Sequence, residues 1–326
     1  MKAVVFDAYG SADRLGAAEV PDPAERSGWV TVELRASALN WHDVLVRQGR
    51  YGSPLPHVPG ADGAGVRVDT GEPVVILPSL FWGTDPAAPG PDFEILGDRT
   101  RGTYAELVSV PAECLAPKPS GYSWAQAAAL PLVGVTTYRA LSTRGQLRPG
   151  ESVLVIGAGG GIATSALAMA RALGANVWVT ASNQQKLDRA VASGAEGGVI
   201  HSGPQWDGDA KALSPSGRGF DLVLDAVGLW DRSVQTLRPG GRVVVLGANV
   251  ASTATLDIRH FFFGQFDIRG TTMGSPADLA GLLRLIDGGT LPPPVIDTEF
   301  DLADAADAHQ HLEAGTGVGK VVLTMN

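Results

Sequence analysis

Cysteine is almost absent from this sequence, which has only Cys114 among its 326 residues. A single cysteine excludes an intramolecular disulfide and any metal site built from several cysteines. No apolar run approaches the length of a membrane-spanning helix. The first residues also lack the apolar core and the cleavage pattern of a signal peptide. We therefore expect a soluble, cytoplasmic protein.

Clusters of basic residues are absent as well. The chain has 25 Lys and Arg against 34 Asp and Glu, a net charge of −9, and no run of Lys or Arg stands out. This charge pattern argues against nucleic acid and anionic membranes as partners. Hydrophobic residues make up 44% of the chain, and 326 residues are enough for two domains with apolar cores.

A glycine-rich stretch lies at the centre of the chain. The apolar run Ser152–Ile156 predicts a buried strand, Ile162–Leu173 predicts a helix, and Val177–Thr180 predicts a second strand. Between the first strand and the helix lie Gly157, Gly159, Gly160 and Gly161. Such a turn can be a tight connection in any α/β protein. Placed between a strand and a helix of a βαβ unit, it predicts a dinucleotide site, because glycines let backbone amides approach a pyrophosphate at the helix N-terminus.

The first 117 residues are β-rich. Trp41–Arg47 is the only clear helix there, and Phe81–Arg101 has several prolines and little periodicity, which predicts a long loop. Short runs separated by Gly, Pro and Asp predict strands at Ala3–Phe6, Trp29–Ala36, Gly65–Val68, Val74–Leu77 and Tyr104–Val110.

Strands and helices alternate in the rest of the chain. Ser123–Leu141 predicts a helix with Ser123 as its N-cap, and Trp206–Gly219 is expected to be irregular. The further helices expected are Lys186–Ala192, Leu229–Leu237, Ala277–Ile286 and Ala303–Leu312. The further strands are Gly198–His201, Phe220–Val227, Gly241–Leu246, Phe266–Gly270 and Lys320–Thr324. This alternation predicts an α/β fold with a doubly wound parallel sheet.

Several blocks of sequence resemble the medium-chain dehydrogenase/reductase superfamily. They are PGADGAG at 59–65, GTYAEL at 102–107, LPLVGVTTYRAL at 130–141, LDAVG at 224–228, LRPGGRVVVLG at 237–247 and GKVVL at 319–323. The resemblance implies a Rossmann domain that binds NADP, residues 121–272, inserted in a β-rich GroES-like catalytic domain, residues 1–120 plus 273–326.

The zinc ligands of this superfamily are missing. Zinc-dependent members bind the catalytic ion through Cys, His and Cys, and the matching positions here are Asn40, Ala61 and Leu132. The counterpart of their four-cysteine lobe, Phe81–Arg101, contains no cysteine. We therefore expect no metal. An alternative ligand set lacks the spacing of a metal site, so we expect its histidines to be solvated or hydrogen-bonded. That set is His42, His57, Asp43 and Asp62.

Without zinc, the chain is most similar to the quinone oxidoreductase and enoyl reductase branches. Tyr51 matches a tyrosine that enoyl reductases place near the substrate as a hydrogen-bond or proton donor. The alternative is a tyrosine that only packs on the prolines of its loop. Asn40 is expected to line the site, where its amide can hydrogen-bond a carbonyl or the cofactor carboxamide. Its alternative is a turn residue at the end of a strand.

The loop after the second strand of the βαβ unit, 180–183, carries no carboxylate to bind a ribose diol. Ser182, Asn183 and Lys186 can instead bind a 2′-phosphate, which predicts NADPH as cofactor. Asp225 is expected to be a structural hydrogen-bonding residue, and His309 and His311 to be surface residues. The full set of expected cofactor-binding residues is Thr136, Gly157, Ala158, Gly159, Gly160, Gly161, Ile162, Ser182, Asn183, Lys186, His201, Val227, Gly228, Leu246, Gly247, Thr271, Thr272 and Met273.

The leading functional hypothesis is a zinc-independent, NADPH-dependent oxidoreductase that transfers hydride to a small electron acceptor of the quinone, enone or enoyl type. Two alternatives stay open: an alcohol or aldehyde dehydrogenase that acts without zinc, and an NADPH-binding structural or regulatory protein with little turnover. We also expect a homodimer joined through Gln265–Thr271. This segment reads as the last strand of the Rossmann sheet, beside the apolar run Phe261–Phe263.

Overall fold

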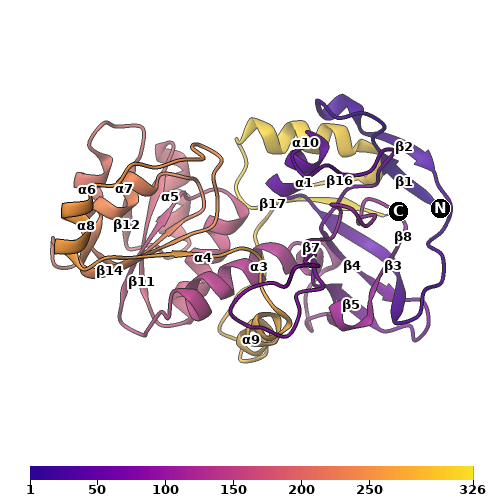
Figure 1. The fold of residues 1–326 in the computed structure, drawn as a ribbon, viewed down its shortest axis with the longest axis horizontal. Helices are drawn as coiled ribbons and strands as arrows, with labels where there is room; N and C mark the ends of the chain where they lie inside the picture. Colours follow the sequence, from indigo (N-terminus) through magenta and orange to yellow (C-terminus); the bar gives the residue numbers. More distant parts are fainter. Residues whose placement is uncertain (326) are drawn as a thin grey trace. The chain divides into compact units, whose positions relative to one another are not determined.

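The computed structural model describes residues 1–325, which form two compact units (Figure 1). The first unit contains Met1–Val135, Gly274–Asp287 and Pro293–Asn326, and the second contains Thr136–Met273 and Gly288–Pro292. Both chain ends therefore belong to one unit, and the second unit is inserted between them. The first unit extends to Val135 and the second begins at Thr136, whereas the expected boundary lies after residue 120.

The first unit is built on a seven-stranded sheet. The strand order is β16-β17-β3-β4-β5-β9, and β8 pairs with β3. The strands are β3 (Trp29–Ala38), β4 (Asp62–Arg67), β5 (Pro73–Ile76), β8 (Leu107–Pro111), β9 (Leu115–Pro117), β16 (Ile296–Asp301) and β17 (Lys320–Thr324). β16 is absent from the sequence prediction. Apolar residues from both chain ends share one core, for example Phe6, Leu39 and Leu323.

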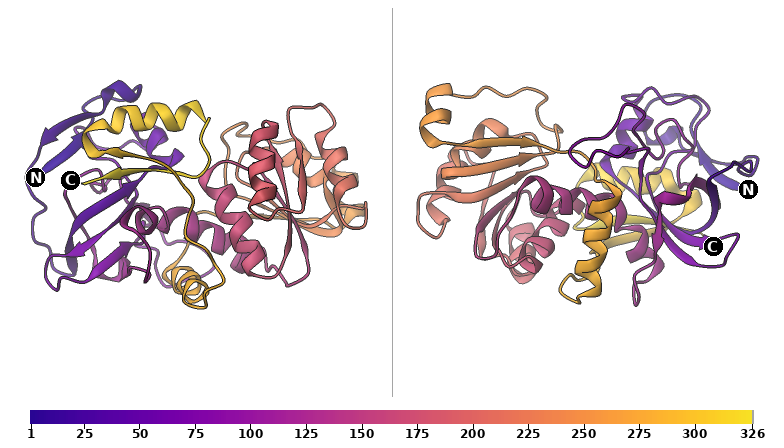
Figure 2. Two further views of the ribbon diagram at one scale, coloured as in Figure 1. Left: turned by 180° about the vertical axis from the view of Figure 1, so that it is seen from behind. Right: turned by 60° about the horizontal axis from the view of Figure 1, so that its bottom comes forward.

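Two small sheets, four α-helices and three 3₁₀ turns complete this unit (Figure 2). β1 (Lys2–Val5) pairs with β2 (Gly16–Glu19), and β6 (Ser79–Leu80) pairs with β7 (Glu94–Ile95). Phe81–Arg101 is otherwise loop, as predicted. The α-helices are α1 (Trp41–Arg47), α2 (Trp124–Ala128), α9 (Pro276–Asp287) and α10 (Ala305–Ala314), and the 3₁₀ turns are η1 (Ala12–Arg14), η2 (Ala112–Cys114) and η4 (Leu302–Asp304).

The single helix predicted for Ser123–Leu141 is wrong, because the segment divides. α2 starts at the predicted N-cap Ser123, whose hydroxyl accepts from the Gln126 amide at 3.1 Å. α3 (Pro131–Tyr138) starts anew at Pro131, whose missing N–H is tolerated only at the first turn of a helix. A π-helical segment, η3 (Arg139–Arg144), follows it.

The second unit is a six-stranded parallel sheet in the order β12-β11-β10-β13-β14-β15. The strands are β10 (Ser152–Ile156), β11 (Asn176–Ala181), β12 (Gly197–Ile200), β13 (Phe220–Asp225), β14 (Leu237–Val245) and β15 (Asp267–Gly270). After β10 the chain adds β11 and β12 on one side of β10, and then β13, β14 and β15 on the other side. The order therefore reverses between β10 and β13, which is where doubly wound sheets bind ligands. The predicted fold class is confirmed.

Helices lie on both sides of this sheet (Figure 2). They are α4 (Gly161–Ala172), α5 (Gln184–Ala192), α6 (Trp206–Leu213), α7 (Trp230–Gln235) and α8 (Ile258–Gly264). The expectation that Trp206–Gly219 is irregular is wrong for its first half. Trp206 and Ala210 stand one turn apart and are buried in the sheet core, and this packing stabilises α6 where local sequence does not indicate a helix.

The apolar run Phe261–Phe263 lies within α8, a helix that the sequence did not indicate. Its N-cap Asp257 accepts from the His260 amide at 3.0 Å. Phe262 and Phe263 are 50% and 71% exposed. β15 lies at the edge of the sheet, as predicted. In the part of the chain that the structure describes, no helix is both long and apolar enough to cross a membrane.

Candidate functional site

Sheet register brings the candidate site of the first unit together. In the antiparallel pairs around β3, Ala38 lies opposite Asp62 on one side and opposite Val322 on the other. Asn40 follows Ala38 by two residues, and Lys320 precedes Val322 by two residues. Residues far apart in the sequence therefore meet at one end of β3.

Asp62 is the centre of this cluster and is completely buried. One carboxylate oxygen, Oδ1, accepts from the Leu132 amide at 2.7 Å. The other, Oδ2, accepts from Asn40 Nδ2 at 2.9 Å and from Lys320 Nζ at 3.1 Å. The Lys320 ammonium also donates to Asn40 Oδ1 at 2.5 Å. A buried carboxylate needs such partners, because an unpaired buried charge is costly.

These residues do not fit a zinc ion. The methyl of Ala61 and the isobutyl group of Leu132 carry no donor atom. The Lys320 ammonium bonds to both Asn40 and Asp62, so a cation already occupies the polar centre of the cluster. Across residues 1–325, no group of three or more His, Cys, Asp or Glu side chains is arranged to hold a metal ion.

Asn40 caps α1 and is buried. Its backbone amide donates to Asp43 Oδ2 at 2.7 Å, and Asp43 Oδ1 accepts from the Ala61 amide at 3.1 Å. Its side-chain nitrogen donates to Asp62 and, at 3.3 Å, to the Ala38 carbonyl. Both amide hydrogens therefore have protein acceptors. Burial raises the pKa of Asp43 to about 6, although His42 and the Asn40 amide act in the opposite direction.

Three polar side chains meet beside this cluster. His42 Nε2 lies 2.6 Å from Asp98 Oδ1, and the two side chains are 10% and 11% exposed. The Tyr51 ring lies 4.5 Å from the His42 ring, centroid to centroid. Tyr51 is 45% exposed, and its hydroxyl has no hydrogen-bond partner among residues 1–325. Burial and the Asp98 charge raise the pKa of this phenol.

The four residues of the alternative ligand set, His42, His57, Asp43 and Asp62, make separate hydrogen bonds. His57 is buried and its Nε2 donates to the Gly97 carbonyl at 2.8 Å. Burial lowers the pKa of His57, so it is a neutral donor. Asp43 and Asp62 accept backbone amides. The expectation of hydrogen-bonded histidines is confirmed for both His42 and His57.

In the second unit, the glycine turn follows β10 and ends at the N-cap of α4, Gly160. Gly157 has φ +102°, which favours glycine. A Cβ at Gly160 would meet no protein atom within 4 Å, so the turn leaves open space at the start of the helix. No side chain caps α4, and its first amides stay available to an anion. The residues therefore fit a dinucleotide pyrophosphate.

A short hydrogen-bond chain joins the ends of three strands. The Gly157 amide donates to Thr180 Oγ1 at 2.9 Å, and Thr180 Oγ1 lies 3.0 Å from His201 Nδ1. That oxygen accepts from Gly157, and its hydroxyl hydrogen can be donated to His201 Nδ1. Burial, and then the Lys186 charge, lower the pKa of His201. A neutral ring with Nδ1 as acceptor presents Nε2–H as its donor.

The predicted phosphate-binding loop lies between β11 and α5. Ser182 and Asn183 are exposed and Lys186 is half-buried. Asn183 Oδ1 accepts from the Lys186 amide at 3.0 Å and so caps α5. The Asn183 amide nitrogen remains a donor. The positive N-terminus of α5 and the Lys186 charge lie together there, as a phosphate site requires.

The other predicted cofactor residues follow the carboxyl ends of β13, β14 and β15. Asp225 is buried and accepts amides of Val227, Gly228 and Leu229 at 2.8–2.9 Å, so its predicted structural role is confirmed. Thr136 Oγ1 lies 3.9 Å from Met273 Sδ. Ala158, Gly159, Gly161 and Ile162 lie in the glycine turn and the start of α4, while Leu246, Gly247, Thr271 and Thr272 follow strand ends.

Sequence reasoning missed three residues of these clusters: Lys320, Asp98 and Thr180. Only the block GKVVL pointed toward Lys320. The expectation that His309 is a surface residue is wrong. His309 is fully buried, and its Nε2 lies 3.0 Å from the Tyr104 hydroxyl. α10 presents this face to the core of the first unit, while His311 on the same helix stays partly exposed and pairs with Asp297.

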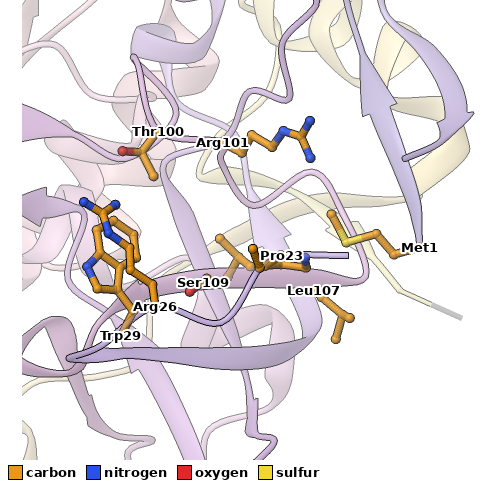
Figure 3. Close-up of a pocket in the computed structure, with 10 residues that line it drawn as sticks. Met1, Pro23, Arg26, Trp29, Thr100, Arg101, Leu107 and Ser109 are labelled. Atoms are coloured by element: carbon orange, nitrogen blue, oxygen red, sulfur yellow. The ribbon is translucent and has the colours of Figure 1, made fainter. Parts of the chain in front are cut away.

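Two surface hollows lie elsewhere on the first unit. The smaller, about 210 Å³, has the Arg26 guanidinium over the Trp29 ring, with Arg101 near its far side (Figure 3). The larger, about 390 Å³, is lined by β1, β2 and the loop before α10, including Val4 and Leu302. Neither is lined by a predicted site residue.

Comparison with known proteins identifies the family. Residues 26–120 match the family described as alcohol dehydrogenase GroES-like domain, and residues 161–288 match zinc-binding dehydrogenase. The chain is 31% identical over 349 residues to a zinc-type alcohol dehydrogenase-like protein of Schizosaccharomyces pombe, covering 100% of this chain and 99% of the relative. It is 31% identical over 330 residues to the chloroplastic NADPH-dependent alkenal/one oxidoreductase of Arabidopsis thaliana, covering 99% and 79%.

The structural comparison agrees. A solved structure of an NAD-dependent alcohol dehydrogenase superposes with a TM-score of 0.92 at 37% identity, with 100% of both chains covered. The names of these relatives include both NAD and NADPH as cofactor. The chain is therefore an oxidoreductase of the medium-chain dehydrogenase/reductase superfamily.

Proposed function

We propose that the protein is a zinc-independent, NADPH-dependent reductase of quinones, enones or enoyl compounds. The observation that carries this proposal is that the positions matching the zinc ligands hold Asn40, Ala61 and Leu132, of which two carry no donor atom. The oxygen of Asn40 accepts from the Lys320 ammonium. A carbonyl cannot be polarised there by a bound metal. Acceptors whose double bond is already activated by conjugation depend least on such polarisation.

The cofactor, when bound, supplies the hydride. The glycine turn and the free N-terminus of α4 would hold its pyrophosphate. Ser182, the amide of Asn183 and Lys186 would bind the 2′-phosphate, with His201 Nε2–H beside them. Strand-end residues from Val227 to Met273 would line the remainder of the cofactor. The chain's part in the reaction is to orient the acceptor, exclude water and deliver a proton.

Asn40 is part of this site as a fixed surface. Its amide hydrogens go to Asp62 and Ala38, and its oxygen accepts from Lys320. We assign it a position beside the acceptor, where these hydrogen bonds hold its side chain in place. Tyr51, with its unpartnered hydroxyl, would bind the acceptor oxygen.

A single screen tests the proposal. NADPH and NADH oxidation is followed with a quinone, a cyclic enone, an enoyl thioester and an aldehyde, and NADP⁺ reduction with primary and secondary alcohols. We expect turnover of conjugated acceptors and none of alcohols. Turnover confined to alcohols and aldehydes would support the alcohol dehydrogenase alternative. Tight NADPH binding without turnover of any acceptor would support a structural role.

A further inference from the structure

We infer that His42, held by Asp98, donates the proton that completes reduction of a conjugated acceptor. This inference rests on the proposed function and adds a residue pair to it. Reduction of an enone needs a proton as well as a hydride, because hydride addition leaves an enolate. The sequence pointed to Tyr51 for this step, but the geometry points to the imidazole beside it.

The two ring nitrogens of His42 have different surroundings. Nε2 is committed to Asp98 at 2.6 Å. Nδ1 has no hydrogen-bond partner among the described residues, and it is not sealed from solvent. One nitrogen is thus fixed by a carboxylate, while the other is left for a ligand or a proton acceptor. A carboxylate in this position orients the imidazole ring.

Backbone hydrogen bonds of its turn hold Asp98 in place. It lies in the turn that follows β7, where its amide donates to the Ile95 carbonyl at 3.0 Å. The neighbouring Gly97 amide donates to the Thr100 carbonyl at 3.1 Å, and the Gly97 carbonyl accepts from His57 Nε2. Buried His57 therefore positions the turn, and the turn positions the carboxylate. A catalytic group requires such support from the residues behind it.

The two candidate acids, His42 and Tyr51, differ in how readily each gives up a proton. The charged and titratable groups that face His42 are Asp98, Asp43 of the same helix and the Tyr51 phenol. Burial and the Asp98 charge raise the pKa of the Tyr51 phenol, which moves it further from neutral pH. A general acid works best when its pKa is near the working pH, and the ordinary pKa of an imidazole lies nearer to that pH than the ordinary pKa of a phenol. The imidazole is therefore the better proton donor.

The step balances without another reagent. The β-carbon of the enone receives the hydride and its electron pair, and the α-carbon carries the resulting negative charge. The Nδ1–H bond of the His42 imidazolium breaks and a C–H bond forms at the α-carbon. His42 is left as a neutral imidazole and takes a new proton from solvent.

Four variants test this step: His42→Gln, Asp98→Asn, Tyr51→Phe and His311→Gln. The last is the matched control, because His311 Nε2 bonds to Asp297 at 2.7 Å in another histidine–aspartate pair outside the site. Turnover is measured with 2-cyclohexen-1-one and with 1,4-benzoquinone, and NADPH affinity by fluorescence titration. The reduced quinone is a stable phenolate and needs no immediate protonation, whereas the enolate carbon does.

We expect His42→Gln to lower kcat for the enone about a hundredfold or more, the usual contribution of a general acid. The loss with the quinone should be much smaller, and NADPH affinity should not change. Asp98→Asn should also lower kcat for the enone and leave NADPH affinity unchanged, because its amide does not hold the imidazole as the carboxylate does. Tyr51→Phe should cost less than His42→Gln. His311→Gln should match the native protein.

The outcomes distinguish failure of the proposed function from failure of the inference about His42. If the native protein reduces neither probe, the proposed function fails. If it reduces the enone and His42→Gln performs like His311→Gln, the inference fails while the function stands. An equal loss with enone and quinone would assign His42 a merely structural role and would overturn the inference. A full loss in Tyr51→Phe with little effect in His42→Gln would return the proton donor to Tyr51.

Discussion

The Lys320 ammonium lies 3.1 Å from the Asp62 carboxylate, and both side chains are almost fully buried at 4% and 0% exposure. The first residue of β17 thus neutralises the first residue of β4, with β3 between their strands. Breaking a buried ion pair from one side leaves an uncompensated charge, which typically costs about 3–5 kcal/mol.

Lys320→Met should therefore lower the free energy of unfolding by about this amount. Adding Asp62→Asn to Lys320→Met should recover part of the loss, because the amide oxygen can still accept from the Leu132 amide and no buried net charge is left. Urea unfolding of the native protein, both single variants and the double variant forms a complete cycle. Strictly additive effects would show that the two side chains are not coupled.

Activity should not depend on zinc. We expect less than stoichiometric zinc by elemental analysis, and full turnover of the best acceptor after dialysis against a strong chelator. The reason is that Ala61 and Leu132 offer no ligand and Lys320 bonds to Asn40 and Asp62. About one tightly held zinc per chain, with turnover lost on its removal and regained on its return, would contradict this.

NADPH should bind more tightly than NADH. Charge-assisted hydrogen bonds contribute roughly 1.5–3 kcal/mol, so Lys186→Ala should weaken NADPH about tenfold to a hundredfold and leave NADH nearly unchanged. Titration of tryptophan fluorescence measures both constants. Lys211→Ala on α6 is a matched control outside the predicted loop.

The converse substitution tests the same loop. An aspartate placed there should repel the 2′-phosphate and reverse the preference. Ala181 is fully buried at the end of β11, so a carboxylate there would also destabilise the fold. Ser182→Asp puts the charge on an exposed position. Equal affinities for the two cofactors in the native protein would show that this loop does not select.

We propose that the protein is a homodimer paired through β15. An edge strand exposes unpaired amides and carbonyls, and the adjacent helix α8 exposes Phe262 and Phe263. Light scattering at micromolar concentration should give twice the chain mass, and Phe263→Asp should lower it toward the monomer. A monomer mass for the native protein would refute the dimer. An unaltered dimer in Phe263→Asp would move the interface away from α8.

Stability should fall in acid through His309. Burial and the Arg47 charge lower the pKa of His309 to about 3. The unfolded chain takes up the proton near the ordinary pKa of 6.5, while the folded chain does not. The stabilisation is therefore complete above about pH 6.5 and is lost progressively as the pH falls toward 3.

At pH 4.5 the difference amounts to about 2–3 kcal/mol relative to pH 7.5. Chemical unfolding of the native protein and of His309→Gln at both pH values isolates this contribution, because the other titratable groups act equally on the two proteins. Glutamine can still accept from the Tyr104 hydroxyl. The same pH dependence in both proteins would show that His309 is not the group responsible.

The sequence by itself determined the parts that depend on local pattern. The bounds of α1, β10 and β17 were predicted to the residue. The pattern of apolar residues that predicts such an element lies within the element's own consecutive residues. The glycine turn and the missing carboxylate after β11 are local for the same reason. The absence of zinc ligands at three positions also needed no coordinates, since alanine and leucine carry no donor atoms.

The tertiary structure decided what depends on residues distant in sequence. Lys320 meets Asp62 through the register of β17, β3 and β4, and Asp98 reaches His42 from a loop without periodicity. The sequence predicted His309 as a surface residue because the other face of its helix is polar, yet His309 is buried. Helix α6 forms because Trp206 is buried in the core of the second unit. Such contacts depend on sheet pairing and burial, which are properties of the folded chain rather than of any short segment.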